Sequence, residues 1–219
     1  MTTERTVAFI DLAGFTALTE VHGDGAAIDL IDALTDAAVE ACRKAEAQLV
    51  KTIGDAVMIA APTPAAGFEA VRLLFQVAYG LDGFPEPRAG LHHGPVIERD
   101  GDYFGATVNL AARVASRAAS GQALITEPIL GAAAEADIDV VPLGSQQLRN
   151  ILDPVELYAV ELCATQVDVA VDPVCRMRLS CQATIARVKH AGIEHRFCSL
   201  GCVAAFATDP DRYITGAST

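Results

Sequence analysis

The chain has 219 residues, of which 52% are apolar, and a formal net charge of −12 at pH 7. This apolar content can form a sizeable core and excludes a disordered chain, while the acidity argues against general binding to nucleic-acid backbones. Residues 1–163 hold 23 acidic and ten basic side chains. A polyanionic ligand of this part would therefore need metal ions. Because no apolar run approaches the roughly 20 residues of a membrane span and the first residues do not resemble a signal peptide, we expect a cytoplasmic protein.

The first predicted elements are a strand and a helix. Residues 6–11 form a short apolar run that ends at Asp11, where Leu12, Ala13 and Gly14 break it, as expected of a buried strand. In residues 26–45 apolar side chains recur at helical spacing and acidic ones occupy the other faces. This pattern predicts an amphipathic helix.

The following segments alternate between strand and helix patterns. Gly54-Asp55 separates two apolar runs and predicts a hairpin. A helix over residues 64–79, a second strand pair and a helix over about 107–119 that Gly121 ends complete the pattern. The expected strands are residues 48–53, 56–61, 88–92, 95–98, 123–126, 140–143 and 155–161. This order predicts an α+β fold, with helices on one side of a mostly antiparallel sheet.

Two carboxylates stand where apolar strands meet turns. Asp11 closes the first strand and Asp55 lies in the hairpin turn. If the sheet brings these turns to one edge, the pair can hold two Mg²⁺ ions, hard cations that prefer oxygen and bridge to phosphates. The alternative is that Asp11 caps a helix and Asp55 only serves the turn.

Further polar candidates surround the third predicted helix. Asp102 precedes it, and Asn109 and Arg113 share one of its faces because they are four residues apart. An amide and a guanidinium stacked in this way can grip a sugar and a phosphate. The alternative for this pair is a solvated helix face.

Four of the six cysteines fall within the last 45 residues. In a reducing compartment such a cluster favours metal or redox chemistry over structural disulfides. Hydrophobic periodicity lapses just before it, so we divide the chain into residues 1–163, a linker over 164–170 and a small Cys-rich α+β module over 171–215.

The first part resembles the catalytic domains of class III adenylate and guanylate cyclases. Four segments carry the resemblance in the family's order over about 160 residues: FIDLAGFTALTE, KTIGDAVMIA, GLHHGPVIERDGDYFGATVNLAARVAS and LRNILDPVELYAV. The resemblance implies a ferredoxin-like cyclase fold and a head-to-tail homodimer with two shared sites. It also implies conversion of ATP to 3',5'-cyclic AMP and pyrophosphate with two Mg²⁺ or Mn²⁺ ions per site.

The matched motifs assign a role to each candidate. Asp11 and Asp55 match the metal-binding pair, Lys51 and Asp102 the pair that reads adenine, Asn109 the residue that orients the ribose and Arg113 the transition-state arginine. Adenine N1 accepts and N6 donates a hydrogen bond, which complements a Lys donor and an Asp acceptor, so ATP is favoured over GTP. We also expect backbone N–H groups of the turn that includes Leu12, Gly14, Phe15 and Thr16 to cradle phosphate oxygens.

One motif departs from the family. Where many relatives have Leu-Lys-Gly, this chain has Leu148-Arg149-Asn150. Arg149 keeps the charge for terminal phosphates, but loss of the Gly can change the loop.

The last segment resembles a YHS domain, a small metal-associated module related to the TRASH group. Asp-Pro-Val-Cys, Phe-Cys-Ser-x-x-Cys and Asp-Pro-x-x-Tyr carry the match, with Arg176 in place of the usual Gly after the first Cys. Cys175, Cys198 and Cys202 form a soft ligand set that suits Zn²⁺ or Cu⁺. Cys181 and His195 are weaker ligand candidates, and the alternative is a small fold with inert buried cysteines.

The leading function is therefore an adenylate cyclase with a metal- or redox-responsive module. Two alternatives stay open: a nucleotide- and metal-binding regulatory protein with little turnover, and a guanylate cyclase. We expect no nucleic-acid partner.

Overall fold

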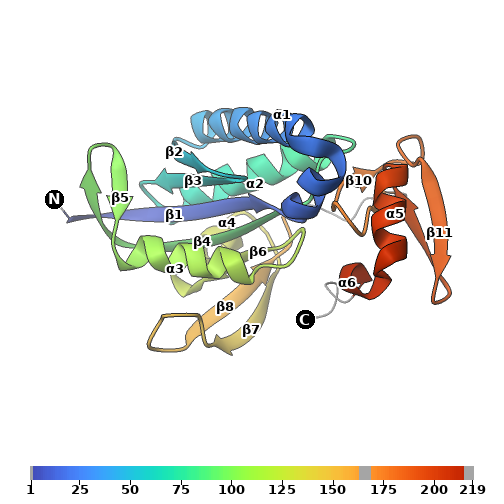
Figure 1. Ribbon diagram of the computed structural model, residues 1–219. Coiled ribbons are helices and arrows are strands. Elements are labelled where there is room, and N and C mark those ends of the chain that lie inside the picture. The colour runs from blue at the N-terminus through green and yellow to red at the C-terminus, as the bar shows by residue number, and fades with distance from the viewer. Residues whose placement is uncertain (1, 163–168, 215–219) are drawn as a thin grey trace.

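The computed structural model describes residues 2–162 and 169–214, which form a larger sheet-based part and a smaller C-terminal part (Figure 1). We call residues 169–214 the tail. The larger part contains β1 (Thr2–Leu12), α1 (Phe15–Lys44), β2 (Gln48–Ile53), β3 (Ala56–Ala61), α2 (Pro64–Gly80), β4 (Pro87–Arg99), β5 (Asp102–Phe104), α3 (Ala106–Arg117), β6 (Ala123–Thr126), a 3-10 turn (Glu127–Ile129), α4 (Leu130–Glu135), β7 (Val140–Gln146) and β8 (Val155–Val160).

The strands form one mixed sheet in the order β2-β3-β1-β4-β6-β8-β7, and β5 pairs with β4. Every printed pairing is antiparallel except that of β4 with β6. In the register of β1, Asp11 lies opposite Ala56 of β3 on one side and Arg88 of β4 on the other. The sheet thus brings the end of β1 next to the β2–β3 turn, where Asp55 lies.

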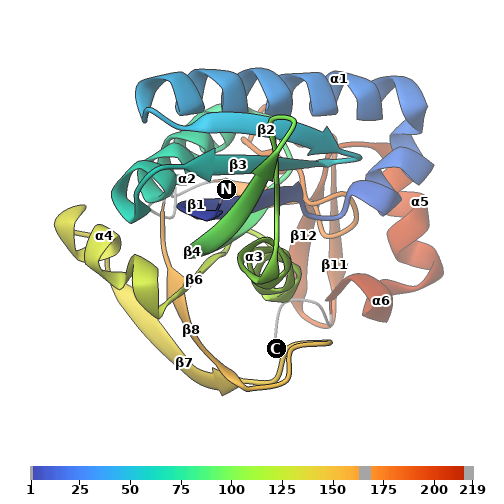
Figure 2. The same cartoon turned by 90° about the vertical axis from the view of Figure 1, so that its left-hand side faces the viewer.

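Helices cover both faces of the sheet because β1 alternates between two apolar faces. Ala8 and Ile10 belong to the large core under α1, α2 and α4, whereas Val7 packs with Ala111 of α3 on the opposite face. In Figure 2, α1 and α3 lie on opposite sides of the strands. The α+β class is as expected, but α3 adds a layer that the expected single layer of helices did not include.

Helix α1 changes direction at Gly23. This residue has φ 83° and ψ 166°, which is not a helical conformation, so α1 consists of a short segment, Phe15 to His22, and a long one. The short segment is turned toward the tail (Figure 1). We call it the front segment of α1.

The tail contains β9 (Ala170–Val171), β10 (Arg178–Leu179), β11 (Ala186–His190), β12 (Ile193–Phe197), α5 (Leu200–Thr208) and α6 (Pro210–Ile214). Its apolar cluster is shared with α1, since Leu18 and Ala27 are buried together with tail side chains: Val174, Cys175, Phe197, Cys202 and Phe206. Backbone hydrogen bonds join residues 83–86 to residues 176–178. The tail therefore docks firmly on the larger part.

Within the described residues, none of the helices combines the length and the apolar character needed to cross a membrane.

Candidate active site

Asp11 and Asp55 lie side by side at the edge of the sheet. Arg88 donates hydrogen bonds to Asp11 Oδ2 through Nε, at 2.9 Å, and through Nη2. The carboxyl group of Asp55 lies close enough for Asp11 to influence its titration. The pair that the strand ends predicted is therefore assembled by the antiparallel pairing of β1 with β3 and β4.

The electrostatics of this pair fit a cation. Burial, followed by the proximity and charge of Asp11, raises the pKa of Asp55 to about 6. Asp11 Oδ1 is buried and has no hydrogen-bond partner among the described residues. Two adjacent carboxylates and an orphaned oxygen are a donor set that Mg²⁺ or Mn²⁺ would satisfy.

The turn after β1 offers backbone donors beside these carboxylates. Gly14 adopts φ 72° and begins α1 without a side-chain cap, so the first N–H groups of the helix have no intrahelical partner. Residues 12–17 line a hollow of about 540 Å³ together with Asp55 and Arg88. An anion in this hollow would meet the N-terminal end of α1, which carries partial positive charge.

The tail forms part of the wall of this hollow, which the sequence did not predict. Pro173, Val174, Arg176, Arg212 and Tyr213 line it. Arg176 is held in place because its guanidinium forms an ion pair with Glu86 at 2.8 Å and donates to Ser120 Oγ at 3.1 Å. A Cβ on Gly14 would lie 2.6 Å from Arg176 Cγ, so the turn and the tail are in direct contact.

Lys51 of β2 and Asp102 of β5 come together, although 51 residues separate them. Lys51 Nζ donates to Asp102 Oδ2 at 2.5 Å, and this hydrogen bond lowers the pKa of Asp102. The side chains are 39% and 28% exposed, so a ligand can still reach both. The structure thus pairs a donor and an acceptor at the position where the sequence predicted recognition of a base.

Asn109 and Arg113 lie on α3 and line a different hollow, with Asn150 and Ile151 of the β7–β8 connection. No hydrogen bond or ion pair of the Arg113 guanidinium occurs within the described residues. Arg149 directly precedes Asn150 in the sequence and is exposed, but it does not line this hollow. Arg149 and Asn109 keep their assigned roles only as predictions.

The candidate residues of one chain therefore face separate places. Asp55 and the turn line the first hollow, Asn109 and Arg113 line the second, and the Lys51–Asp102 pair borders neither. A nucleotide that uses all of them cannot be held within one such hollow. This arrangement agrees with a site completed by a second chain.

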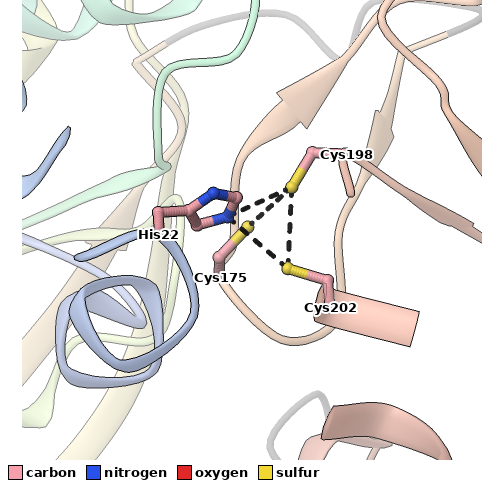
Figure 3. Close-up of side chains that lie close together, drawn as sticks. All are labelled: His22, Cys175, Cys198 and Cys202. Carbon is pink, nitrogen blue, oxygen red and sulfur yellow. Dashed lines mark hydrogen bonds between the residues drawn. The ribbon is translucent and has the colours of Figure 1, made fainter. Parts of the chain in front are cut away.

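The three tail cysteines converge, as predicted, but their fourth neighbour was not predicted (Figure 3). Cys175, Cys198, Cys202 and His22 place one sulfur or nitrogen atom each within 4.8 Å of one another. Cys181 is exposed, and the ring of His195 packs 5.2 Å from that of Phe206. Neither belongs to the cluster. Only the fold reveals His22, because it lies more than 150 residues before the first of these cysteines.

Comparisons with known proteins agree with this geometry. Residues 2–161 match the model of the adenylate and guanylate cyclase catalytic domain, and residues 170–217 match that of the YHS domain. The chain is 38% identical over 172 residues to a pH-sensitive adenylate cyclase of Mycobacterium tuberculosis, covering 74% of this chain and 41% of that protein. It is 31% identical over 169 residues to an adenylate cyclase of Glutamicibacter nicotianae, covering 75% and 41%.

The chain thus spans about two fifths of the length of these relatives. Among solved structures, an adenylate cyclase of Trypanosoma brucei in its monomeric state matches with a TM-score of 0.65 and 25% identity, covering 75% of this chain and 91% of that one. An adenylyl cyclase of P. aeruginosa shares the fold, with a TM-score of 0.62, 24% identity and coverage of 77% and 97%. The chain therefore belongs to the family of adenylate and guanylate cyclase catalytic domains and carries a YHS domain after that domain.

Proposed function

We propose that this protein is an adenylate cyclase that converts ATP to 3',5'-cyclic AMP and pyrophosphate. The observation that carries the proposal is the half-buried Asp11–Asp55 pair, with its orphaned oxygen, beside a hollow lined by the start of α1. Carboxylates beside an anion-binding turn are unfavourable for a triphosphate unless cations lie between them. Family membership supports the same reaction class.

In the proposed reaction, the ribose 3'-oxygen forms a bond to the α-phosphorus while the bond from that phosphorus to the pyrophosphate oxygen breaks. Two Mg²⁺ or Mn²⁺ ions, held by Asp11 and Asp55, would supply activation of the 3'-hydroxyl and neutralise the triphosphate. The turn over residues 12–16 binds phosphate oxygens through backbone N–H groups. Arg113 offsets charge that grows on the α-phosphate, and Asn109 orients the ribose.

Two arguments support a homodimer with shared sites. The first is the separation of the hollow lined by Asp55 from the hollow lined by Asn109 and Arg113 within one chain. The second is that Arg113 has a half-buried guanidinium without a partner in the described chain, which suits a group that meets its ligand across an interface.

The metal assignment is tested by Asp11→Asn and Asp55→Asn, which keep the shape of each side chain and remove its charge. We expect each to lower kcat at least about 100-fold in Mg²⁺, because the triphosphate charge is then uncompensated. Asp36→Asn, at an exposed position of α1, is the matched control and should leave kcat unchanged. Near-normal turnover in both site variants would disprove the two-metal assignment.

The preference for ATP rests on the Lys51–Asp102 pair. Lys51→Glu combined with Asp102→Cys reverses or removes the donor and acceptor, so the ratio of kcat/KM for ATP to that for GTP should fall. Steady-state assays with both nucleotides measure this ratio. An unchanged ratio would refute the base-reading role, and wild-type protein that uses GTP better than ATP would make it a guanylate cyclase. Nucleotide binding without turnover in either assay would favour a regulatory binding protein.

We further propose that the tail binds Zn²⁺ or Cu⁺ through Cys175, Cys198 and Cys202 and acts as an input to the cyclase. The contact of Arg176 with Gly14 supports this coupling, because it links the cysteine segment to the anion-binding turn.

A further inference from the structure

We infer that His22 of α1 is the fourth ligand of the tail's metal site, so that Zn²⁺ is bound jointly by the YHS domain and the cyclase domain. The inference rests on the proposal that the tail binds a soft metal. It adds a ligand from outside the YHS domain and places the ion at the contact between the two domains.

The distances fit a tetrahedral ion. For Zn–S bonds of about 2.3 Å and a Zn–N bond of about 2.0 Å, ligand atoms should lie roughly 3.5 to 3.8 Å apart. The Sγ atom of Cys198 lies 3.5 Å from that of Cys175 and 3.6 Å from that of Cys202. His22 Nε2 lies 3.4 Å from Cys198 Sγ and 3.6 Å from Cys202 Sγ. All four distances are close to those of an S₃N site.

The same distances argue against a disulfide. Paired sulfur atoms lie about 2.05 Å apart, and these cysteines are all free. Free cysteines can lose their protons to give thiolates, the form that binds metals.

Asp172 holds the segment that contains Cys175 against the segment that contains Cys198. It is fully buried, and its Oδ1 accepts a hydrogen bond from the N–H of Val174 at 2.8 Å while its Oδ2 accepts one from the N–H of Cys198 at 2.9 Å. Ser199 caps α5 by accepting from the N–H of Cys202 at 3.1 Å. Such supporting hydrogen bonds orient ligands before the metal binds.

His22 reaches the cluster because of the bend in α1. It is the last residue of the front segment, and Gly23 with φ 83° turns the chain immediately after it. Leu18, one turn earlier, is buried in the cluster that includes Cys175 and Cys202. The imidazole therefore projects from a segment that is packed against the tail (Figure 3).

The front segment also carries the anion-binding turn at its other end. Gly14 begins the helix and His22 ends its first segment, so one short helical segment joins the metal ligand to the phosphate-binding turn. A bound ion would fix the His22 end of this segment against the tail, while the Gly14 end already contacts Arg176. Occupancy of the site would thereby restrict the motion of the turn that lines the nucleotide hollow.

The test measures Zn²⁺ affinity of the full chain, reduced and titrated in competition with a chromophoric chelator. Wild-type protein should bind one Zn²⁺ per chain, and His22→Ala should bind it at least about 10-fold more weakly. His195→Ala and Cys181→Ser remove the alternative fourth ligands and should stay within about twofold of wild type. If His22→Ala binds as tightly as wild type, the inference is wrong while the tail site stands. If wild type binds no Zn²⁺, both are wrong.

A second measurement, made on the wild-type chain, does not depend on whether His22→Ala folds. Wild-type chain loaded with ¹¹³Cd²⁺ should show scalar coupling between the metal and one histidine Nε2 in long-range ¹H–¹⁵N spectra. The coupling should persist in His195→Ala. Its absence from the wild-type spectrum, in a protein that binds the metal, would overturn the inference.

Amide hydrogen exchange tests the link to the turn. Zn²⁺ should slow exchange in residues 15–22 of wild type, and Cys198→Ser with Cys202→Ser should abolish this protection. Protection confined to the tail would contradict an ion shared between the domains.

Discussion

At two positions where cyclase and YHS domains usually have Gly, this chain has another residue in a left-handed backbone conformation. Asn150 has φ 62° and Arg176 has φ 60°. Asn tolerates this region well, so the β7–β8 loop keeps its turn without the Gly. Arg176 costs more strain, which its hydrogen bonds to Glu86 and Ser120 offset. The departures seen in the sequence therefore preserve the backbone and change the side chains.

His92 predicts an acid sensitivity of the fold. It lies on β4 with its Nδ1 2.7 Å from Thr126 Oγ1, and burial, then the charge of His93, lowers its pKa to about 4. Between pH 6.5 and 4 the unfolded chain protonates this side chain while the folded one does not, so stability falls as the pH falls. His92→Asn should remove about 1–2 kcal/mol of this loss.

Urea unfolding of wild type and His92→Asn at pH 7 and pH 4.5 measures the effect. Between pH 7 and pH 4.5, wild type should lose more free energy of unfolding than His92→Asn loses. If the free energy of unfolding depends on pH equally in both proteins, another group causes the loss of stability at low pH.

At the scale of single residues, the sequence predicted the Asp11–Asp55 pair because each residue ends a strand beside a turn. It did not predict His22, since no local pattern reports which helix end will meet a distant loop. Nor did it predict that Arg176 and Arg212 of the tail line the hollow beside Asp55. Ligand sets built across domains depend on docking, which periodicity does not encode.

At the scale of elements, most strand and helix types agree with the prediction, but β5 and α4 were not predicted and several boundaries differ. Residues 88–98 were expected to form two strands, but β4 runs without a break from Pro87 to Arg99. Gly94 lies between the two expected strands and allows a close approach, because a Cβ there would lie 2.8 Å from Thr107 Oγ1 of α3. Helix α1 begins 11 residues earlier than expected, because Gly23 bends the helix without ending it.

Gly90 sets the position of α3, the helix that carries Asn109 and Arg113. A Cβ on Gly90 would lie 2.0 Å from the backbone N of Ala115, so Gly90→Ala must push α3 away from β4. We expect the free energy of unfolding to fall by about 1–3 kcal/mol. We expect kcat to fall by a larger fraction than the free energy of unfolding does, because α3 carries Asn109 and Arg113.

The matched control for Gly90→Ala is Gly131→Ala on α4, where an added Cβ meets nothing within 4 Å. It should be neutral or stabilising by up to about 1 kcal/mol. Urea unfolding and steady-state kinetics of both variants provide the comparison. A Gly90→Ala protein with wild-type stability would show that α3 is not held by this contact.

At the scale of the whole molecule, the separated hollows predict complementation between chains. Asp11→Ala and Arg113→Ala chains should each be inactive alone. A mixed dimer holds one intact site, so mixing should restore up to about a quarter of wild-type activity per chain if pairing is random and sites act independently. Differently tagged chains allow the mixed dimer to be isolated. If isolated mixed dimers stay inactive, the shared-site arrangement is wrong.

The apolar cluster shared by α1 and the tail has a consequence for handling the protein in the laboratory. Leu18 is fully buried and Ala27 is 4% exposed, and tail side chains contribute to that burial. A shortened catalytic domain that ends before residue 169 would display these side chains, with the half-buried Val21 and Leu30 beside them, as an exposed apolar patch. Such a fragment would tend to precipitate or to pair through the wrong face, and low activity in it would report poor solubility rather than a missing activator.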